Sequence, residues 1–294
     1  MFVEIFKSLR PQQWIKNFFV FAPLIFSEKA FDPNLFLRAG MAFAIFCLLS
    51  GSLYILNDLK DIEEDKHHPI KCRRPLASGR LGKKQALAAF IVFSTAGFVL
   101  ACLVNEYFCV MALIYFLLQV LYSAWLKNVV ILDVFIIAAG FFIRVIAGAL
   151  AIEVYITPWL LICTILLALF LALSKRRHEL VLLEQDASHH RPILKEYSPY
   201  LLDQMISVVT ASTVIAYCLY TISEETISKF GTRYLIFTVP FVLYGIFRYL
   251  YLVHQKTEGG NPEVLVLKDR PLLLDIFLWI LSAVLIIYFD SLFS

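Results

Sequence analysis

Apolar stretches recur along almost the whole chain and determine its predicted architecture. A membrane-crossing helix needs about 20 mostly apolar residues to span roughly 30 Å of hydrocarbon. Nine segments fit this pattern, the first of them short, near Trp14–Ser27, Phe36–Leu56, Gln85–Val104, Tyr107–Trp125, Val129–Ile152, Thr157–Ser174, Leu201–Ile222, Arg233–His254 and Leu272–Asp290. The pattern therefore predicts an all-α, polytopic integral membrane protein with nine transmembrane helices in a single domain, residues 1–294.

Composition supports a membrane location. The chain is 60% hydrophobic and only 17% charged, with a mean hydropathy of +0.77, whereas charged residues make up about a quarter of a soluble domain. The net charge of +3 does not indicate nucleic-acid binding, because the basic residues follow the topology and lie beside acidic ones. Most of the six cysteines lie in apolar segments without a C-x-x-C pair, so we expect core residues rather than disulfides or zinc ligands.

The distribution of Lys and Arg between the spans predicts the orientation. Cytoplasmic loops of membrane proteins carry an excess of basic residues. If the N-terminus is cytoplasmic, that side collects most of the basic residues between the spans, and the opposite side keeps only Lys29, Arg38, Lys229 and Arg233. No small-x-small cleavage site follows "FFVFAPLIF", so we expect this first segment to belong to the mature protein.

An acidic stretch, "NDLKDIEEDKHHPIKCRRPLASG", follows the second span directly. If the helix continues into it, Asn57, Asp58, Asp61 and Asp65 fall within one sector of about 100°. Carboxylates crowded at a membrane interface repel one another and need a cation. Mg²⁺ suits them, since it binds one or two carboxylates and completes its coordination with waters and phosphate oxygens. The spacing therefore predicts Asp58, Asp61 and Asp65 as metal ligands and catalytic residues.

Basic residues follow these aspartates. Together with Asn57, they offer hydrogen-bond donors to a phosphate, and the arginines can bind it through two parallel hydrogen bonds. The candidates are His68, Lys71, Arg73 and Arg74. The competing interpretation is a solvated loop of mixed charge. The regular N-D-x-x-D-x-x-x-D spacing at the end of a membrane helix favours a binding site.

The same stretch resembles the first aspartate-rich motif of the UbiA-type prenyltransferase superfamily. This resemblance implies nine helices around a central cavity that opens to the cytoplasmic side and binds a magnesium diphosphate. Four further stretches keep the family's order along the chain: "RPQQWIKN", "FFIRVIAGA", "SKRRHEL" and "GGNPEVLVLKDRPL". They narrow the resemblance to the branch that transfers a phosphoribosyl group to a polyprenyl phosphate.

One departure from the prenyltransferase pattern supports this branch. The loop after the sixth span reads "SKRRHELVLLEQDASHH", with Asp186 as its only aspartate, where prenyl-diphosphate enzymes resemble one another in a second D-x-x-x-D motif. Lys175, Arg176 and Arg177 suit a further anion rather than a second magnesium, and Glu179 can orient Arg176 from one helical turn away.

The resemblance thus implies transfer of ribose 5-phosphate from phosphoribosyl pyrophosphate to a decaprenyl-like polyprenyl phosphate, with release of pyrophosphate. The donor carries a 5-phosphate besides its diphosphate, and the acceptor is itself a lipid phosphate, so the pair presents several anionic groups. We expect an enzyme of the bacterial or archaeal plasma membrane with a cytoplasmic active site.

A few other polar residues are candidates for substrate binding. Lys16 and Asn17 begin the first span, and Lys127 precedes the fifth. Each of the three could reach a headgroup. The lysines could instead only extend their ammonium groups to the membrane interface. Arg144 shares one stripe of the fifth span with Asp133. An intramembrane arginine often marks a functional site, but Arg144 could instead tie helices together.

Two other functions remain open at this point. An ordinary prenyltransferase, moving a prenyl group from a prenyl diphosphate to an aromatic or other small acceptor, would share the fold and the first motif, although the absent second motif counts against it. A transporter is the alternative without chemistry, but the chain has no convincing repeated halves.

Overall fold

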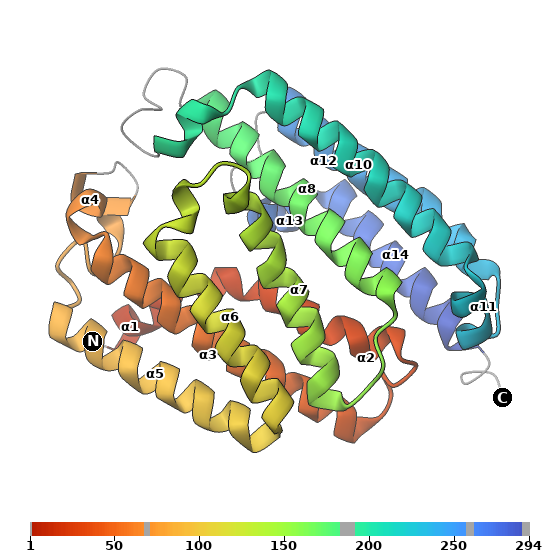
Figure 1. The fold of residues 1–294 in the computed structure, drawn as a ribbon, viewed down its shortest axis with the longest axis horizontal. Helices are drawn as coiled ribbons and strands as arrows, with labels where there is room; N and C mark the ends of the chain where they lie inside the picture. Colours follow the sequence, from red (N-terminus) through yellow and green to blue (C-terminus); the bar gives the residue numbers. More distant parts are fainter. Residues whose placement is uncertain (1, 68–70, 183–191, 257–261, 290–294) are drawn as a thin grey trace. The chain divides into compact units, whose positions relative to one another are not determined.

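The computed structural model describes residues 2–67, 71–182, 192–256 and 262–289 (Figure 1). Within these ranges, eight helical segments are long and apolar enough to cross a membrane, which confirms an all-α membrane protein. They are α3 (Pro33–Lys60), α5 (Lys83–Val104), α6 (Glu106–Ala124), α7 (Leu132–Ile152), α8 (Pro158–Leu182), α10 (Pro199–Ile222), η5 (Tyr234–Thr238) with α12 (Val239–Gln255), and α14 (Arg270–Ile287).

Shorter helices connect these segments. The shorter elements are α1 (Phe2–Ser8), η1 (Pro11–Phe21), α2 (Ala22–Phe26), α4 (Ile62–His67), η2 (Lys71–Arg73), η3 (Leu126–Asn128), η4 (Pro192–Glu196), α11 (Glu224–Phe230) and α13 (Pro262–Lys268). Two of them, α4 and η2, follow the end of α3 and lie within the acidic stretch.

The first predicted span is formed by η1 and α2 rather than by one long α-helix. The 11 residues of η1 are a 3-10 helix, which rises about 2 Å per residue, and the five of α2 add about 1.5 Å each. If collinear, the two would extend roughly 30 Å, close to the thickness of the hydrocarbon. The count of nine spans therefore stays a prediction, with eight identified in the described ranges.

The described chain forms two compact units. Unit 1 comprises Met1–Trp125 and Ile143–Tyr155, and unit 2 comprises Leu126–Phe142 and Ile156–Ser294. The single domain and the central cavity expected from the sequence both stay predictions.

Local sequence signals set where the helices begin. Asp32 caps α3 by accepting hydrogen bonds from the backbone N–H groups of Asn34 and Leu35, at 2.9 and 3.2 Å. Ser198 does the same for α10, and both helices begin with proline, whose fixed φ suits the first turn and whose missing N–H costs nothing there.

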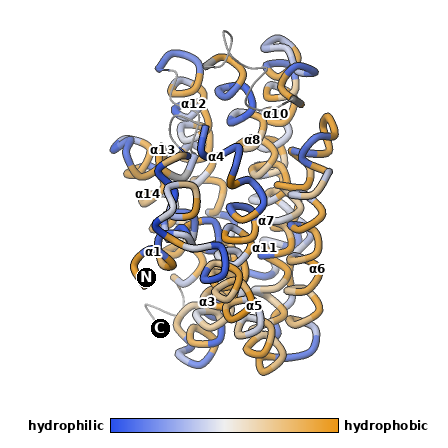
Figure 2. Tube along the Cα trace, turned by 90° about the vertical axis from the view of Figure 1, so that its left-hand side faces the viewer, coloured by the Kyte–Doolittle hydropathy of each residue, from blue (hydrophilic) through white to orange (hydrophobic). Residues whose placement is uncertain are grey.

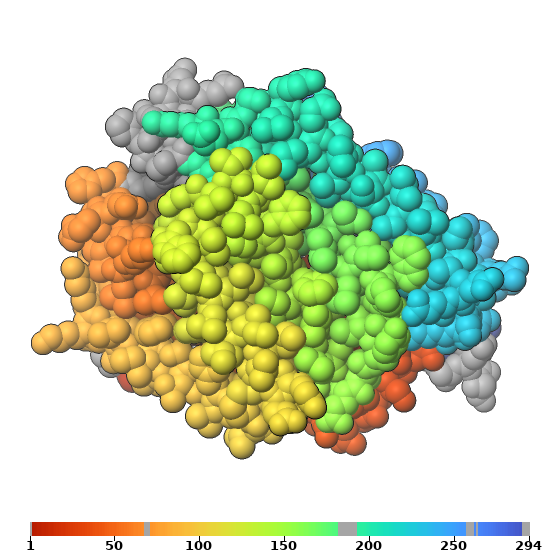
Figure 3. Space-filling view, in the orientation of Figure 1, coloured from red at the N-terminus to blue at the C-terminus, as the bar shows by residue number. Residues whose placement is uncertain are grey.

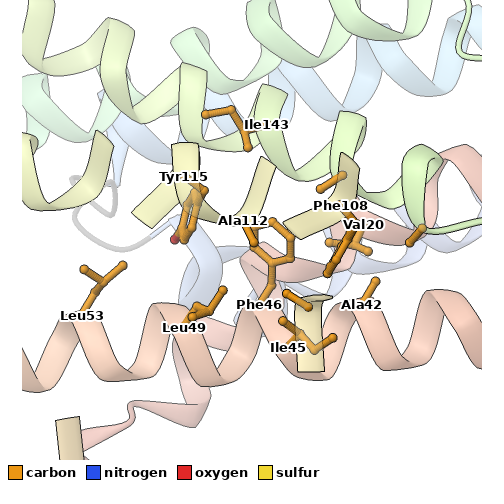
Figure 4. Close-up of a cluster of buried hydrophobic side chains, with 13 residues drawn as sticks. Val20, Ala42, Ile45, Phe46, Leu49, Leu53, Phe108, Ala112, Tyr115 and Ile143 are labelled. Carbon is orange, nitrogen blue, oxygen red and sulfur yellow. The ribbon is translucent and has the colours of Figure 1, made fainter. Parts of the chain in front are cut away.

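Unit 1 packs around the buried face of α3. Ile45, Phe46 and Leu49 from α3 meet Phe108 and other apolar side chains of α6 in one cluster (Figure 4). The rings of Phe46 and Phe108 meet edge to face, with centroids 5.9 Å apart. Because lipid tails are as apolar as these side chains, their close packing, rather than exclusion of water, holds the helices together.

A glycine allows one close approach of backbones in unit 1. A Cβ atom added to Gly148 of α7 would lie 2.1 Å from the carbonyl oxygen of Val20 in η1. No side chain fits at that position. The glycine therefore lets the backbone of α7 approach η1 closely.

Helices α5 and α6 carry much of the apolar surface of unit 1. Large hydrophobic side chains such as Ile91, Leu103 and Leu117 are exposed along them, and the two helices form a continuous surface in Figure 3. Figure 2 shows α6 as predominantly hydrophobic. Exposed apolar side chains on spanning helices are expected to face lipid, so these helices form a lipid-contacting face.

Unit 2 is built on α8, α10, α12 and α14. Phe170 of α8 packs against Tyr249 of α12, with ring centroids 5.3 Å apart. The hydroxyl of Tyr217 in α10 lies 2.6 Å from that of Thr238 and accepts a 2.9 Å hydrogen bond from Trp279 Nε1 of α14. These side-chain hydrogen bonds between helices specify how the bundle of unit 2 packs.

The sequence prediction for the cysteines is wrong at one pair. Cys102 and Cys109 form a disulfide with Cα atoms 4.9 Å apart. They come together because α5 ends at Val104 and α6 begins at Glu106, so the tight turn returns the chain beside itself. The remaining four, Cys47, Cys72, Cys163 and Cys218, are not in a disulfide.

Candidate functional site

The end of α3 positions the first group of predicted site residues in unit 1. The helix ends at Lys60, and Asp61 forms a bend before α4. Helical hydrogen bonds nevertheless continue on both sides of the bend, from Asp61 N to Asn57 O at 2.9 Å and from Asp65 N to Asp61 O at 2.8 Å. The chain therefore nearly keeps the helical register on which the one-face prediction depends.

Asp58 and Asp65 come together around Arg74. Arg74 Nη1 donates to Asp58 Oδ1 at 3.1 Å and to Asp65 Oδ2 at 2.6 Å. Asp58 is 2% exposed and Asp65 is 3% exposed, and Lys71 Nζ lies 4.0 Å from Asp65 Oδ1. Two buried carboxylates would repel each other strongly, so the shared guanidinium is what makes their proximity tolerable.

Arg10 is a further cation of this group, and it was not among the residues selected from the sequence. Its guanidinium pairs with Asp58 Oδ1 and stacks over the ring of Tyr54, 4.8 Å from the centroid. Arg10 has a left-handed backbone with φ 53°, which is uncommon for a residue with a Cβ. The Arg10-Pro11 pair before the first span was the available sequence signal.

The third aspartate differs from the other two. Asp61 is partly exposed, and its carboxylate has no ion pair within the described ranges. There, no group of three Asp, Glu, His or Cys side chains converges closely enough to hold a metal ion. The donor chemistry still fits Mg²⁺, because the ion pairs of Asp58 with Arg10 and Arg74 both use Oδ1 and a carboxylate oxygen is a hard ligand.

The other predicted residues near these aspartates take several positions. Asn57 is half-buried on α3, Arg73 is exposed in η2, and Lys16 is half-buried in η1, with its ammonium 2.7 Å from Gln13 Oε1. His68 lies outside the described residues.

Arg144 and Asn17 form a second, buried group in unit 1. Arg144 is 5% exposed and donates from Nε to Asn17 Oδ1 at 2.8 Å and from Nη2 to the hydroxyl of Tyr115 at 2.7 Å. Asn17 Nδ2 in turn donates to Ser50 Oγ at 3.2 Å. The arginine thus ties η1, α6 and α7 together, as the structural alternative in the sequence analysis expects.

In unit 2, Arg176 is a buried structural arginine. It is 1% exposed, pairs with Glu179, and donates from Nε to Asp133 Oδ2 at 2.7 Å. The orienting contact predicted for Glu179 is confirmed. Asp133 of α7 is fully buried. Its ion-pair partner is Arg176 of α8, and the position of Asp133 on the same face of α7 as Arg144 does not predict that partner.

Tyr197 completes this buried group, and the sequence analysis missed it. Its hydroxyl donates to Asp133 Oδ1 at 2.8 Å and accepts from the backbone N–H of Ile131 at 2.7 Å. Burial, reinforced by the hydrogen bond to Asp133, raises the pKa of Tyr197 to about 12. The phenol therefore stays protonated and donates to the carboxylate at neutral pH.

The remaining basic candidates of unit 2 lie around this group. Arg177 pairs with Asp203, which also lies 3.2 Å from His254 Nε2. Lys175 and Lys127 are half-buried, on α8 and η3. Of the three consecutive bases, Arg176 and Arg177 thus have carboxylate partners within unit 2.

A family model described as the UbiA prenyltransferase family matches residues 18–287. The chain belongs to this family. The match covers both units and every long helix of the described chain.

Relatives and solved structures of the family add detail. The chain is 31% identical to a decaprenyl-phosphate phosphoribosyltransferase of Mycolicibacterium smegmatis, over 97% of this chain and 93% of that protein. A second protein of that name, from Corynebacterium glutamicum, is also 31% identical, over 98% of this chain and 87% of the relative.

A UbiA homolog from Archaeoglobus fulgidus bound to GPP and Mg²⁺ matches with a TM-score of 0.72 and 18% identity, covering 97% of this chain and 99% of that one. At this identity the match supports the UbiA fold alone.

Proposed function

We propose that the protein is a Mg²⁺-dependent enzyme that transfers ribose 5-phosphate from phosphoribosyl pyrophosphate to a polyprenyl phosphate. The observation that carries the proposal is the similarity, over 97% of the chain, to a relative named decaprenyl-phosphate phosphoribosyltransferase. Reaction takes place on the cytoplasmic side of the plasma membrane, where the basic loops predict that the acidic stretch lies.

The reaction exchanges one oxygen for another at the anomeric carbon of the ribose. The bond from C1 to the pyrophosphate oxygen breaks, a bond from C1 to an oxygen of the lipid phosphate forms, and pyrophosphate leaves. Such transfers pass through a transition state with oxocarbenium character. A lipid phosphate is already ionised at neutral pH, so the reaction needs no dedicated general base.

The acidic group of unit 1 suits the leaving pyrophosphate. Asp58, Asp61 and Asp65 would hold Mg²⁺, which when bound neutralises charge on the leaving group. When no metal is present, Arg74 and Arg10 offset the charge of Asp58, and Arg74 that of Asp65, through their ion pairs. The same cations can then bind phosphate oxygens.

Other basic residues would recognise the remaining phosphates. Lys71 lies beside the aspartates, and Arg73 is exposed in the same segment. In unit 2, Arg176 is 1% exposed whereas Lys175 is half-buried, so we assign phosphate contact in that segment to Lys175. Lys16, Asn17, Asn57, Lys127 and Arg144 remain candidate substrate contacts.

A prenyltransferase that uses a prenyl diphosphate is the second candidate, because the A. fulgidus structure of the same fold is bound to GPP and Mg²⁺. Purified protein should be offered each donor in turn, ribose-labelled phosphoribosyl pyrophosphate with polyprenyl phosphate, or a prenyl diphosphate with 4-hydroxybenzoate. We expect Mg²⁺-dependent labelling of the polyprenyl phosphate and no prenyl transfer. Prenyl transfer without ribose labelling would overturn the assignment and leave the fold unaffected.

A further inference from the structure

Unit 1 contains an apolar groove where α3, α5 and α6 meet near their ends. It has a volume of about 540 Å³. All three helices contribute apolar walls, with Leu56 and Leu59 from α3, Leu87 from α5 and Val120 from α6. The three helices are membrane spans, and α5 and α6 carry the lipid-contacting face of this unit. The groove is therefore positioned to receive a lipid. Of the residues proposed above for the reaction, only Asn57 lines it.

Three lysines line the same groove at the helix ends. Lys60 is the last residue of α3, and Lys83 and Lys84 begin α5. Leu56 and Leu87 lie four residues further into these spans than Lys60 and Lys83, about 6 Å along each helix axis. The positive charge thus lies at the membrane surface and the apolar walls lie deeper. This is the order of charge and hydrocarbon in an anionic phospholipid, whose phosphate lies outside its acyl chains.

Lys60 is held at this groove by α6. Its Nζ donates to the backbone carbonyl oxygen of Ser123 at 3.0 Å, and Ser123 also lines the groove. This carbonyl belongs to the last turn of α6, where a cation suits the negative end of the helix dipole. Since an ammonium group has three N–H donors, Lys60 can bind a headgroup oxygen without leaving Ser123.

The positions of Lys83 and Lys84 are less favourable in the protein alone. Both side chains are exposed, and within the described residues neither has an ion pair. Cations in the first turn of a helix lie at the positive end of its dipole, which is unfavourable. Glu63 of α4 pairs with Lys66 at 3.0 Å rather than with either of them. An anionic group bound in the groove would compensate both lysines.

We propose that this groove binds an anionic phospholipid, with the lipid phosphate on Lys60, Lys83 and Lys84 and an acyl chain along Leu87 and Val120. Three ammonium groups favour a headgroup of net negative charge, such as phosphatidylglycerol. A zwitterionic headgroup brings a cation of its own, which the lysines repel. Basic residues at cytoplasmic helix ends are common in membrane proteins, but here an apolar groove places an acyl chain beside them.

Lipid retention by the purified full-length protein tests the proposal. The protein is equilibrated in detergent with phosphatidylglycerol or phosphatidylcholine of identical acyl chains, and bound lipid is counted by native mass spectrometry. A lysine beside an anionic lipid contributes roughly a fivefold factor in affinity. Lys83 and Lys84 together therefore predict that phosphatidylglycerol binds at least about twentyfold more tightly than phosphatidylcholine.

Paired variants separate the groove from general surface charge. Lys83→Gln combined with Lys84→Gln should lower the preference for phosphatidylglycerol about twentyfold. Lys7→Gln combined with Lys66→Gln is the matched control, because it removes the same charge from exposed positions of unit 1 that do not line the groove. The control pair should keep the preference of the unmodified protein.

Phosphatidylglycerol with a photoactivatable diazirine in its acyl chain locates the site. Crosslinks should map to Leu87 and Val120, and their absence from both positions would overturn the proposal. Equal retention of the two lipids by the unmodified protein would do the same, as would an equal loss of preference in the control pair. Loss of the crosslinks when polyprenyl phosphate is added would assign the groove to that lipid instead. None of these measurements uses catalysis, so they stand apart from the test of the transferase.

Discussion

Replacing Arg74 by glutamine distinguishes a metal site from a purely structural ion pair at the end of α3. Arg74 Nη1 lies 3.1 Å from Asp58 Oδ1 and 2.6 Å from Asp65 Oδ2. Glutamine keeps the polarity but removes the charge. Asp58 would retain Arg10. Among the described residues Asp65 would keep only Lys71, at 4.0 Å, so its charge would be less well compensated than that of Asp58.

The expected loss of stability follows from this geometry. Removing one partner of a buried ion pair costs about 3 to 5 kcal/mol. The Arg74 side chain is 27% exposed, so solvent already screens part of its charge, and Lys71 remains. We therefore expect the low end of the range, about 3 kcal/mol, in the absence of divalent ions.

Mg²⁺ should reverse most of this loss if the aspartates bind it. A ligand at a hundred times its dissociation constant stabilises the folded state by about 2.7 kcal/mol, which nearly equals the expected loss. Denaturant unfolding of the purified protein in detergent micelles, with EDTA or with saturating Mg²⁺, measures both quantities. Arg80→Gln is the matched control, because Arg80 lies in the same segment and is exposed.

Asp65→Asn in the Arg74→Gln background supplies the decisive comparison. The double variant should regain stability in EDTA, because no uncompensated carboxylate remains, and should respond much less to Mg²⁺. If Mg²⁺ stabilises the double variant as strongly as the single one, the metal binds elsewhere. An Arg74→Gln protein as stable as the parent in EDTA would refute the electrostatic account itself.

Five further substitutions test other features of the molecule. Asp61→Asn should keep the fold and lower turnover roughly a hundredfold, measured as pyrophosphate release at saturating Mg²⁺, because a charge near the leaving group is lost. Lys175→Gln should raise the Michaelis constant for the donor or the lipid phosphate with little change in the free energy of unfolding. Arg176→Gln should instead cost about 3 kcal/mol or more in unfolding experiments, because the buried carboxylate of Asp133 loses its ion-pair partner. Gly148→Leu should prevent close packing in unit 1 and lower the yield of folded protein in size-exclusion chromatography. Tyr197→Phe should lower stability by about 1 to 3 kcal/mol in denaturant unfolding, because Asp133 loses a donor.

Residue spacing along one helix was enough to predict the acidic group. Asp58 and Asp65 are seven residues apart, and the helical hydrogen bonds that continue through Asp61 keep them on nearly the same side. This spacing could be interpreted from the sequence because it depends only on the geometry of a single helix. The long apolar spans were predictable for the same reason.

Partners from distant segments could not be predicted in this way. Arg10 reaches Asp58 across 48 positions, through a left-handed backbone conformation that the sequence does not specify. Tyr197 reaches Asp133 across 64 positions. Each contact depends on how the helices pack against one another. The spacing of residues along one helix does not indicate which other helix they contact.

Residues that look alike in the sequence can differ strongly in burial, as Arg176 and Lys175 do. Arg176 and Lys175 are adjacent and basic, yet Arg176 is 1% exposed and holds Asp133 and Glu179, whereas Lys175 is half-buried. If this buried guanidinium left Asp133 for a substrate phosphate, the buried carboxylate would lose its ion-pair partner, at a cost of several kcal/mol. Substrate binding would have to repay that cost at every turnover. We therefore propose Lys175 for phosphate recognition in this segment, and Arg176 for holding α7 against α8.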